Sequence, residues 1–370
     1  MILKSGSFDN MAQYVKQTEA KIFLFGAGVI GTVTVPEILH HYELEPYVEC
    51  YIDNEEKKWG KMHKNNYMEI PVFSPQYLNE HHENVIVLLN ISRYSEVLDQ
   101  LEQLKATEKL ICYIIPMMLI YDMETKERIG AIKDYTYQQI PKKIHYMWLG
   151  KKEIPERLQK CIDSWKRFCP DYEIIQWNED NYDLEKNTYM RQAYAAKAYG
   201  FVPDYARLDI LYNYGGIYLD TDVELIRNLD DLLYEEAFCG VEKWQVVNFG
   251  GCSGSTKGNK MIKEFRDNRE NLLFVNPDGS YNRTTCGYYD TKVLLNHGYR
   301  INGKVQKING MNIYTSDYFH PYDYTSGMTQ QTSNTFSIHH FDGGWLDEIM
   351  KKGNEQTAKK FNQLYELTKR

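Results

Sequence analysis

Short apolar runs alternate with helical patterns along the first third of the chain. Four runs have the length of a buried strand and lie at 21–25, 47–52, 85–90 and 110–115. Between them, apolar residues recur at the three- and four-residue spacing of a helix, for example over 94–105. Strands that alternate with helices predict an α/β fold with a parallel sheet.

A glycine-rich turn directly follows the first of these runs. Gly26, Gly28 and Gly31 stand between that strand and a helical pattern that extends to about residue 42. Pro36 inside the pattern predicts a kink or a restart of the helix. Asp53 ends the next strand, at the spacing where an acidic residue binds the ribose of a dinucleotide. The turn is therefore a candidate cofactor-binding site for a nucleotide, and a turn kept only for packing is the equal alternative.

A change in composition marks the end of this first unit, which we place at residues 1–116. A charged and mixed stretch at 117–139 is predicted to be a linker. We predict that a second domain extends over 140–345 and that 346–370 form a helical tail. The second domain opens with strands and helices in alternation, predicted at 143–149, 158–168, 172–177 and 189–199.

The most informative stretch is FVPDYARLDILYNYGGIYLDTDV, at 201–223. A proline suits the first turn of a helix, and Asp204 and Arg207 are three residues apart on that helix, so their side chains share a face. Two glycines end the helix, and three apolar residues form a short strand. This strand delivers Asp220 and Asp222, whose carboxylates can meet one hard divalent cation and the diphosphate that it carries.

Three segments together resemble a known family. Besides 201–223, they are IPKKIHYMWLG at 140–150 and SIHHFDGGW at 337–345. They resemble the DXD region, the opening strand and the closing loop of family 32 glycosyltransferases, the capsule and mannosyl-transfer type. They are also similar to the glucosylating domain of large clostridial toxins. The resemblance implies a GT-A-type fold for the second domain, and the first domain resembles the Rossmann-like domain that precedes many bacterial sugar-modifying enzymes.

The resemblance also implies a metal site. Asp222 would bind Mn²⁺ or Mg²⁺ directly, and Asp220 would hold the ribose and a metal-bound water. A further ligand is expected from the closing loop, where His340 is the first choice and His339 the second. The sequence departs from the family there, because Asp342 and two glycines stand where a serine-containing turn is usual. A structural role for the two histidines in a strand is the alternative.

For the sugar donor, the resemblance implies contacts from the helix and from aromatic side chains. Asp204 and Arg207 would bind sugar hydroxyls and phosphate oxygen, a role that suits the forked guanidinium group. Trp148 would stack on the nucleobase, and Trp345 would donate its indole N–H to the leaving phosphate. The alternatives are a salt bridge on the helix surface and two tryptophans that only pack in the core. Further donor-site candidates are Tyr218 and Asn248.

Composition and charge narrow the classes of partner. The 370 residues are 43% hydrophobic and 25% charged, and the formal net charge of -8 gives no support for a nucleic-acid partner. Seven scattered cysteines without a CxxC pair fit a reducing compartment. The first residues lack the apolar core of a signal peptide, so we expect a cytoplasmic protein. Lys and Arg residues in 346–370 leave peripheral contact with the inner membrane surface as an alternative to a docked or solvated helix.

These observations lead to one leading hypothesis and two alternatives. We expect a bacterial, metal-dependent, retaining hexosyltransferase. Its donor would be a nucleotide-diphosphate sugar, with a UDP-sugar as the first choice. Its acceptor would be a glycan or lipid-linked glycan in capsule or surface polysaccharide synthesis. The first alternative is a transferase that acts on a protein, as the toxins do. The second is a nucleotide-binding scaffold with an inert transferase domain, against which the clustered carboxylates argue because they repel one another.

Overall fold

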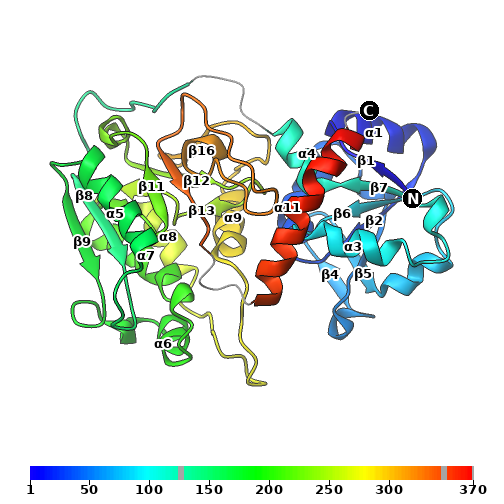
Figure 1. Ribbon diagram of the computed structural model, residues 1–370, viewed down its shortest axis with the longest axis horizontal. Helices are drawn as coiled ribbons and strands as arrows, with labels where there is room; N and C mark the ends of the chain where they lie inside the picture. Colours follow the sequence, from blue (N-terminus) through cyan, green and yellow to red (C-terminus); the bar gives the residue numbers. More distant parts are fainter. Residues whose placement is uncertain (124–128, 343–347, 369–370) are drawn as a thin grey trace.

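The computed structural model describes residues 1–123, 129–342 and 348–368. These residues form two lobes that lie side by side, each built around one large sheet (Figure 1). No helix among the described residues is both long enough and apolar enough to span a membrane.

A seven-stranded sheet forms the first lobe, in the order β1-β7-β6-β2-β3-β5-β4. All neighbouring strands are parallel except the β4–β5 pair. The structure thus has the parallel sheet that the alternating pattern predicts, and it adds three strands that were not predicted: β5 and the three-residue strands β1 and β4. The strands are β1 (Ile2–Lys4), β2 (Lys21–Phe25), β3 (Val48–Ile52), β4 (Met62–Lys64), β5 (Glu69–Phe73), β6 (Val85–Leu89) and β7 (Ile111–Ile114).

Helices cover both faces of this sheet. The helices α1 (Phe8–Thr18) and α2 (Val35–His41) pack on one face, and α3 (Tyr94–Leu101) packs on the other. A five-residue π-helix, η1 (Ile30–Thr34), precedes α2. Pro36 lies in the first turn of α2, where its missing N–H needs no partner, so the helix restarts there as predicted.

The segment predicted to be a linker begins as a helix. The helix α4 (Ile115–Asp122) follows β7 directly, and the four apolar residues after Pro116 are buried. They pack against β6 and β7 because an apolar run of this length gains free energy by leaving water. The residues 117–122 therefore belong to the first lobe, in contrast to the prediction.

A mixed sheet forms the second lobe, in the order β15-β16-β12-β14-β10-β8-β9, with β13 paired to β12. The strands β9, β8 and β10 are parallel, and β14 runs antiparallel to β10 and β12. Two further strands, β11 and β17, form a separate antiparallel pair. The strands are β8 (Lys143–Met147), β9 (Glu173–Trp177), β10 (Gly216–Tyr218), β11 (Val223–Leu225), β12 (Ala237–Val241), β13 (Val247–Asn248), β14 (Ser253–Ser255), β15 (Gln306–Ile308), β16 (Met311–Tyr314) and β17 (Ser337–His339).

Helices also flank the second sheet on both faces. They are α5 (Glu156–Phe168), α6 (Thr188–Ala195), α7 (Pro203–Tyr214), α8 (Lys260–Asp267), α9 (Cys286–Asn296) and α10 (Ser316–Phe319). Short 3-10 turns lie at Glu45–Tyr47, Glu56–Lys58, Pro75–Asn79, Thr107–Lys109, Leu184–Lys186, Tyr199–Phe201 and Asp230–Tyr234. The side chains of β8 alternate between the two faces of the sheet, because Ile144 and Tyr146 join one buried cluster and Met147 joins another.

One buried cluster continues from the first lobe into the second. It contains Ile30 and Val35 of the first lobe together with Val246 of the second. A buried hydrogen bond crosses the same boundary, from Thr34 Oγ1 to the carbonyl oxygen of Trp244 over 2.8 Å. The two lobes are therefore packed against each other rather than joined only by a flexible segment.

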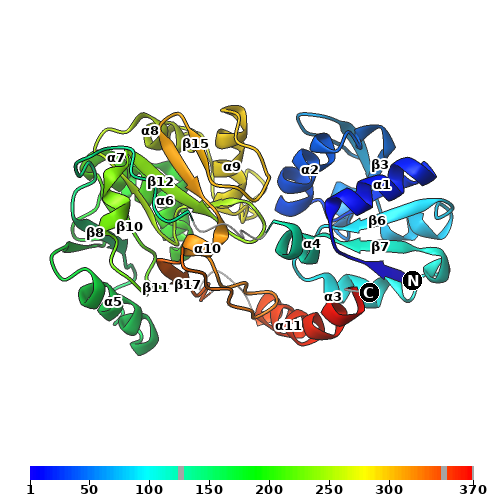
Figure 2. The ribbon, with the colours of Figure 1, turned by 90° about the horizontal axis from the view of Figure 1, so that it is seen from above.

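Within the predicted helical tail, residues 348–368 form α11 (Glu348–Thr368), which packs on the first lobe (Figures 1 and 2). Phe361 and Leu364 are buried in the cluster that contains the apolar residues of α3. Thr357 Oγ1 lies 2.8 Å from Ser95 Oγ in a buried hydrogen bond. The last helix of the chain thus completes the lobe that the first residues begin.

Candidate active site

The turn between α7 and β10 determines where the acidic loop after β10 lies. Gly215 and Gly216 have φ values of 66° and 100°, in the region that favours glycine. A Cβ on Gly216 would lie 2.9 Å from the carbonyl oxygen of Lys143, so β10 and β8 approach closely. The ring of His145 lies 2.8 Å from the carbonyl oxygen of Gly215 and supports the same turn. The chain therefore leaves α7 in one defined direction and delivers the acidic pair at the end of β10.

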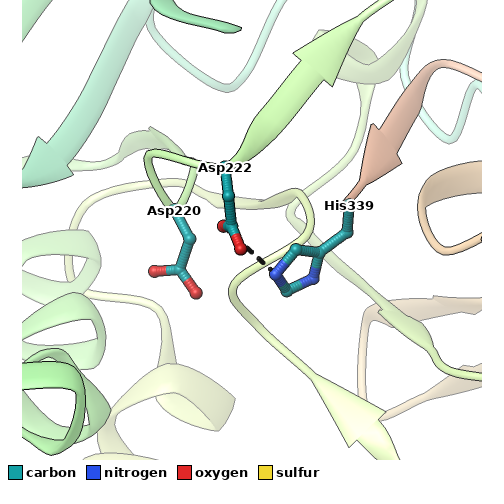
Figure 3. A group of neighbouring side chains, drawn as sticks. All are labelled: Asp220, Asp222 and His339. Atoms are coloured by element: carbon teal, nitrogen blue, oxygen red, sulfur yellow. Dashed lines mark ion pairs between the residues drawn. The ribbon is translucent and has the colours of Figure 1, made fainter. Parts of the chain in front are cut away.

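Asp220, Asp222 and His339 converge at this point (Figure 3). Each offers one ligand atom, and the three atoms lie within 4.8 Å of one another. Two carboxylate oxygens and an imidazole nitrogen form a donor set that fits Mn²⁺ or a similar divalent cation. His339 belongs to β17, which pairs with β11 so that His339 is opposite Val223. The site is thus assembled from two segments more than 110 residues apart in the sequence.

Asp222 is the most strongly held member of this group. Its Oδ1 lies 3.3 Å from His339 Nε2, and its Oδ2 accepts a hydrogen bond of 2.8 Å from the backbone N–H of Asp342. Burial alone would raise the pKa of Asp222, but the charge of His339 and these hydrogen bonds hold the pKa well below its ordinary value. Asp222 is consequently an anion at any physiological pH, as a ligand for a hard cation must be.

The structure brings His339, and not His340, to the carboxylates, which corrects the first choice made from the sequence. His340 Nε2 instead lies 3.0 Å from Glu224 Oε2 at a partly exposed position. Neighbouring side chains of a strand point to opposite faces, so only one of two adjacent histidines can reach the site. The pairing of β17 with β11 decides which one, and this register is a long-range contact that the sequence motif does not contain.

Asp204 and Arg207 form a buried pair beside the acidic group. One Nη atom of Arg207 lies 3.5 Å from Asp204 and 3.4 Å from Asp220, and Arg207 Nε donates to the carbonyl oxygen of Pro203 over 3.1 Å. The side chains of Asp204 and Arg207 are only 7% and 6% exposed. The alternative of a solvated salt bridge on the helix surface is therefore wrong, and the pair links α7 to the end of β10.

Burial raises the pKa of Asp204 to about 6, although Arg207 and Arg269 act in the opposite direction. Between its ordinary pKa and about 6, the folded protein then binds more protons at Asp204 than the unfolded chain, so stability falls as the pH rises through this window.

The Asp204→Asn variant removes this titration. Relative to the wild type, the variant should gain up to about 3 kcal/mol in free energy of unfolding as the pH rises from about 4 to 7. Urea unfolding of both proteins at a series of pH values measures this difference. A difference that stays constant over the series would contradict the raised pKa.

A second buried ion pair lies behind the first. Arg269, which follows α8, and Asp290 of α9 are 2.6 Å apart, and both side chains are 2% exposed. Their charges also influence Asp204, and the ring of Tyr218 lies 5.5 Å from the guanidinium carbon of Arg207. No motif predicts Arg269 or Asp290, because their significance depends only on how α8 and α9 pack. Tyr218, by contrast, lies next to the acidic motif and is where the sequence predicts it.

Asn248 and the turn after it hold the backbone of Asp220 through hydrogen bonds to Gly250. Asn248 Oδ1 accepts a hydrogen bond of 2.8 Å from the N–H of Gly250, and the carbonyl oxygen of Gly250 accepts one of 2.8 Å from the N–H of Asp220. A Cβ on Gly250 would lie 2.0 Å from Asp220 Oδ2 and 3.0 Å from Arg207 Nη1. Only glycine leaves room for both side chains, so this turn shapes the wall of the site.

Trp148 and Trp345 are the two tryptophans predicted to contact the donor. Trp148 follows β8 and is partly buried, and its Nε1 donates to the carbonyl oxygen of Lys152 over 2.7 Å. Its indole N–H is therefore used locally, while its role against a nucleobase remains a prediction. Trp345 lies outside the described residues.

The glycine turn of the first lobe lies at the end of β2. Asp53 Oδ2 accepts a hydrogen bond of 2.9 Å from the N–H of Ala27 and lies 3.1 Å from Lys58 Nζ. Gly26 has a φ of 105°, and a Cβ on Gly31 would lie 2.0 Å from the carbonyl oxygen of Gly26. The φ of Gly26 and the close approach at Gly31 require glycine at both positions, and Asp53 holds the backbone of the turn. A Cβ on Gly28 would meet nothing within 4 Å.

The site thus combines paired carboxylates and an imidazole, which could hold a divalent cation, with a buried Asp–Arg pair beside them. Residues 155–239 match the family described as "Glycosyltransferase sugar-binding region containing DXD motif". This segment contains Asp204, Arg207, Asp220 and Asp222, so the family match falls on the predicted motif.

Several curated proteins are similar to parts of this chain. The chain is 34% identical over 138 residues to inositol phosphoceramide mannosyltransferase 3 of Schizosaccharomyces pombe, a match that covers 33% of this chain and 37% of the relative. It is 37% identical over 113 residues to mannosyl phosphorylinositol ceramide synthase CSH1 of Saccharomyces cerevisiae, covering 27% and 28%. It is 25% identical over 202 residues to subversion of eukaryotic traffic protein A of Legionella pneumophila, covering 46% and 31%.

These matches span about a third of the length of the relatives. Among solved structures, the PaToxG glycosyltransferase is similar with a TM-score of 0.35 and 17% identity, covering 55% of this chain and 77% of that chain. The family match and the names of the two yeast relatives indicate a glycosyltransferase.

Proposed function

We propose that this protein is a metal-dependent, retaining glycosyltransferase that uses a nucleotide-diphosphate hexose as donor. One observation carries the proposal: the acidic motif of the matched segment meets His339 beside the buried pair of Asp204 and Arg207. This arrangement combines ligands for a divalent cation with groups that bind hydroxyl and phosphate oxygens. We further propose that the second lobe is of the GT-A type.

Each part of the site has a proposed task. Asp222, Asp220 and His339 would hold Mn²⁺ or Mg²⁺, and a cation bound there neutralises charge on the leaving diphosphate. Arg207 is fixed by two carboxylates and presents a permanent positive charge to the donor. Asp204, ionised above about pH 6, would accept hydrogen bonds from the hydroxyl groups of the sugar.

For the chemistry, we propose attack on the same face of the sugar from which the diphosphate departs. The bond between the acceptor oxygen and the anomeric carbon forms while the bond from that carbon to the phosphate oxygen breaks. The proton of the acceptor hydroxyl passes to the leaving phosphate, so no carboxylate nucleophile is required. This route gives retention at the anomeric carbon.

The donor and the acceptor are proposed by class. The sequence resemblance favours a UDP-sugar, whereas the names of the yeast relatives favour a mannosyl donor and an inositol phosphoceramide acceptor. We propose that the acceptor is a glycan or lipid-linked glycan of capsule or surface polysaccharide synthesis in a bacterial cytoplasm. A protein acceptor, as in the toxins of the resemblance, is the alternative outcome.

A donor panel tests the proposal. Purified full-length protein would be incubated with UDP-glucose, UDP-galactose, UDP-N-acetylglucosamine and GDP-mannose, with Mn²⁺, with Mg²⁺ and with EDTA, and nucleotide release would be measured. We expect hydrolysis of one donor that depends on the metal, and a rise in melting temperature with the same donor, because a ligand that binds only the folded state stabilises it. Release at full rate in EDTA, or no response to any donor, would contradict the proposal.

For the first lobe we propose a Rossmann-like scaffold. Asp53 is bonded to the turn that a nucleotide would occupy, and helix η1 after the turn is a short π-helix. A site for a nucleotide at Gly26, Gly28, Gly31 and Asp53 is the alternative. A nucleotide that raises the melting temperature of a protein in which Asp222 and Arg207 are replaced would favour this alternative, because the site of the second lobe would then be disabled.

A further inference from the structure

His320 is a buried histidine that no sequence motif predicts. It follows α10, and its side chain has no exposed surface. Its Nδ1 lies 3.3 Å from Nδ1 of His339, whose other nitrogen lies 3.3 Å from Asp222 Oδ1. The ring of His339 therefore has Asp222 at one nitrogen and His320 at the other.

The contact between the two rings restricts the position of a proton. Two imidazole nitrogens at 3.3 Å form a hydrogen bond only if one carries a proton and the other offers a lone pair. A metal ligand needs its lone pair on the nitrogen that faces the carboxylates, which in His339 is Nε2. Neutral His339 then carries its proton on Nδ1, and Nδ1 of His320 must accept it. When His339 is protonated on both nitrogens and paired with Asp222, His320 is the acceptor as well.

The surroundings hold both rings in this arrangement. A Cβ on Gly251 would lie 2.0 Å from Cε1 of His320, so only glycine leaves room for the ring. The backbone N–H of His320 donates to the carbonyl oxygen of Ser316 over 2.7 Å. On the other side, the ring of Phe341 stacks on His339, with centroids 4.0 Å apart and planes inclined by 19°.

We propose that His320 is a positioning residue that fixes the tautomer and the orientation of His339, so that Nε2 of His339 faces the cation. The inference rests on the proposed metal site. The partner on the second nitrogen of a metal-bound histidine typically changes metal affinity by about 10- to 100-fold when it is removed. A histidine that is buried only for packing would leave metal affinity unchanged.

The test measures binding of Mn²⁺ alone, from the electron paramagnetic resonance signal of the free ion, to the full-length protein. His320→Leu keeps the bulk and removes the acceptor, and we expect it to weaken binding about 10- to 100-fold. His320→Asn places an amide oxygen near the position of Nδ1 and should recover most of the affinity. His320→Met replaces the leucine variant if that variant does not fold, as judged by circular dichroism.

A double-mutant cycle shows whether His320 acts through His339. In a His339→Ala background, His320→Leu should cause no further loss of Mn²⁺ affinity. Equal affinity of the wild type and His320→Leu, or a loss that persists without His339, would overturn the inference. A wild type that binds Mn²⁺ no better than Asp222→Asn would instead show that the proposed metal site itself is wrong.

Discussion

The Asp222→Asn variant is expected to stay folded and to lose donor hydrolysis and transfer almost entirely, by about 10³-fold in kcat/KM or more. Asparagine has the size of the carboxylate but brings no charge to a hard cation. Asp222 is also the only member of the metal group that touches both His339 and the backbone of Asp342 among the described contacts. A loss of about 4 kcal/mol of charge stabilisation at the leaving phosphate corresponds to this factor, since about 1.4 kcal/mol is tenfold.

Glu224→Gln is the matched control for this variant. Glu224 is two residues further along the chain and undergoes the same chemical change, but its carboxylate faces His340 and is 45% exposed. An exposed ion pair of this kind contributes little free energy, so the rate of the Glu224→Gln variant should remain within about fivefold of the wild-type rate. Nucleotide release in the presence of Mn²⁺ and thermal unfolding would be measured for all three proteins. Equal losses in the two variants would show that Asp222 has no special part in the reaction.

The Arg207→Leu variant is expected to lower the free energy of unfolding by about 3–5 kcal/mol and to abolish activity. Arg207 is the common partner of Asp204 and Asp220, which would face each other across a buried site without it. Removal of one member of a buried charge group leaves the others uncompensated, which is the costly case. Urea unfolding at neutral pH measures the loss. Asp204→Asn in the same chain should recover part of it, because one of the two repelling carboxylates is then neutral.

Arg266→Leu on α8 is the control for stability. Arg266 lies 2.8 Å from Asp267 and 3.4 Å from Asp209, so it too joins two carboxylates. Each of these acids keeps another cation, Lys263 for Asp267 and Lys186 for Asp209. The loss should therefore stay near 1 kcal/mol or less. If both arginine variants lose the same stability, the buried network around Arg207 has no special energetic role.

The parts of the site that are local in sequence could be predicted. Asp204 and Arg207 share a helix face, and the two glycines and the short strand after them define where Asp220 and Asp222 emerge. These relations depend on helix periodicity and on the conformational freedom of glycine, both of which a sequence displays directly. The strands β2, β3, β6 and β7 of the first lobe were also predictable, because each is an apolar run of strand length.

The parts that depend on packing between distant segments could not be predicted. The choice between His339 and His340 follows from the register of β17 against β11. Arg269, Asp290 and His320 become neighbours of the site only through the positions of α8, α9 and α10. The apolar run that becomes α4 was assigned to a linker because its neighbours in the sequence are charged, whereas its packing partners are β6 and β7.

The position of α11 has a consequence for how the protein is made. A ribosome produces the first sheet and α3 long before it produces residues 348–368, which cover the outer side of α3. Until Phe361 and Leu364 emerge, the apolar side chains that they will bury stay accessible to chaperones and to other nascent chains. The first lobe is thus completed only after the second has been made, and a ribosome that stalls within the second lobe would leave the first one unfinished.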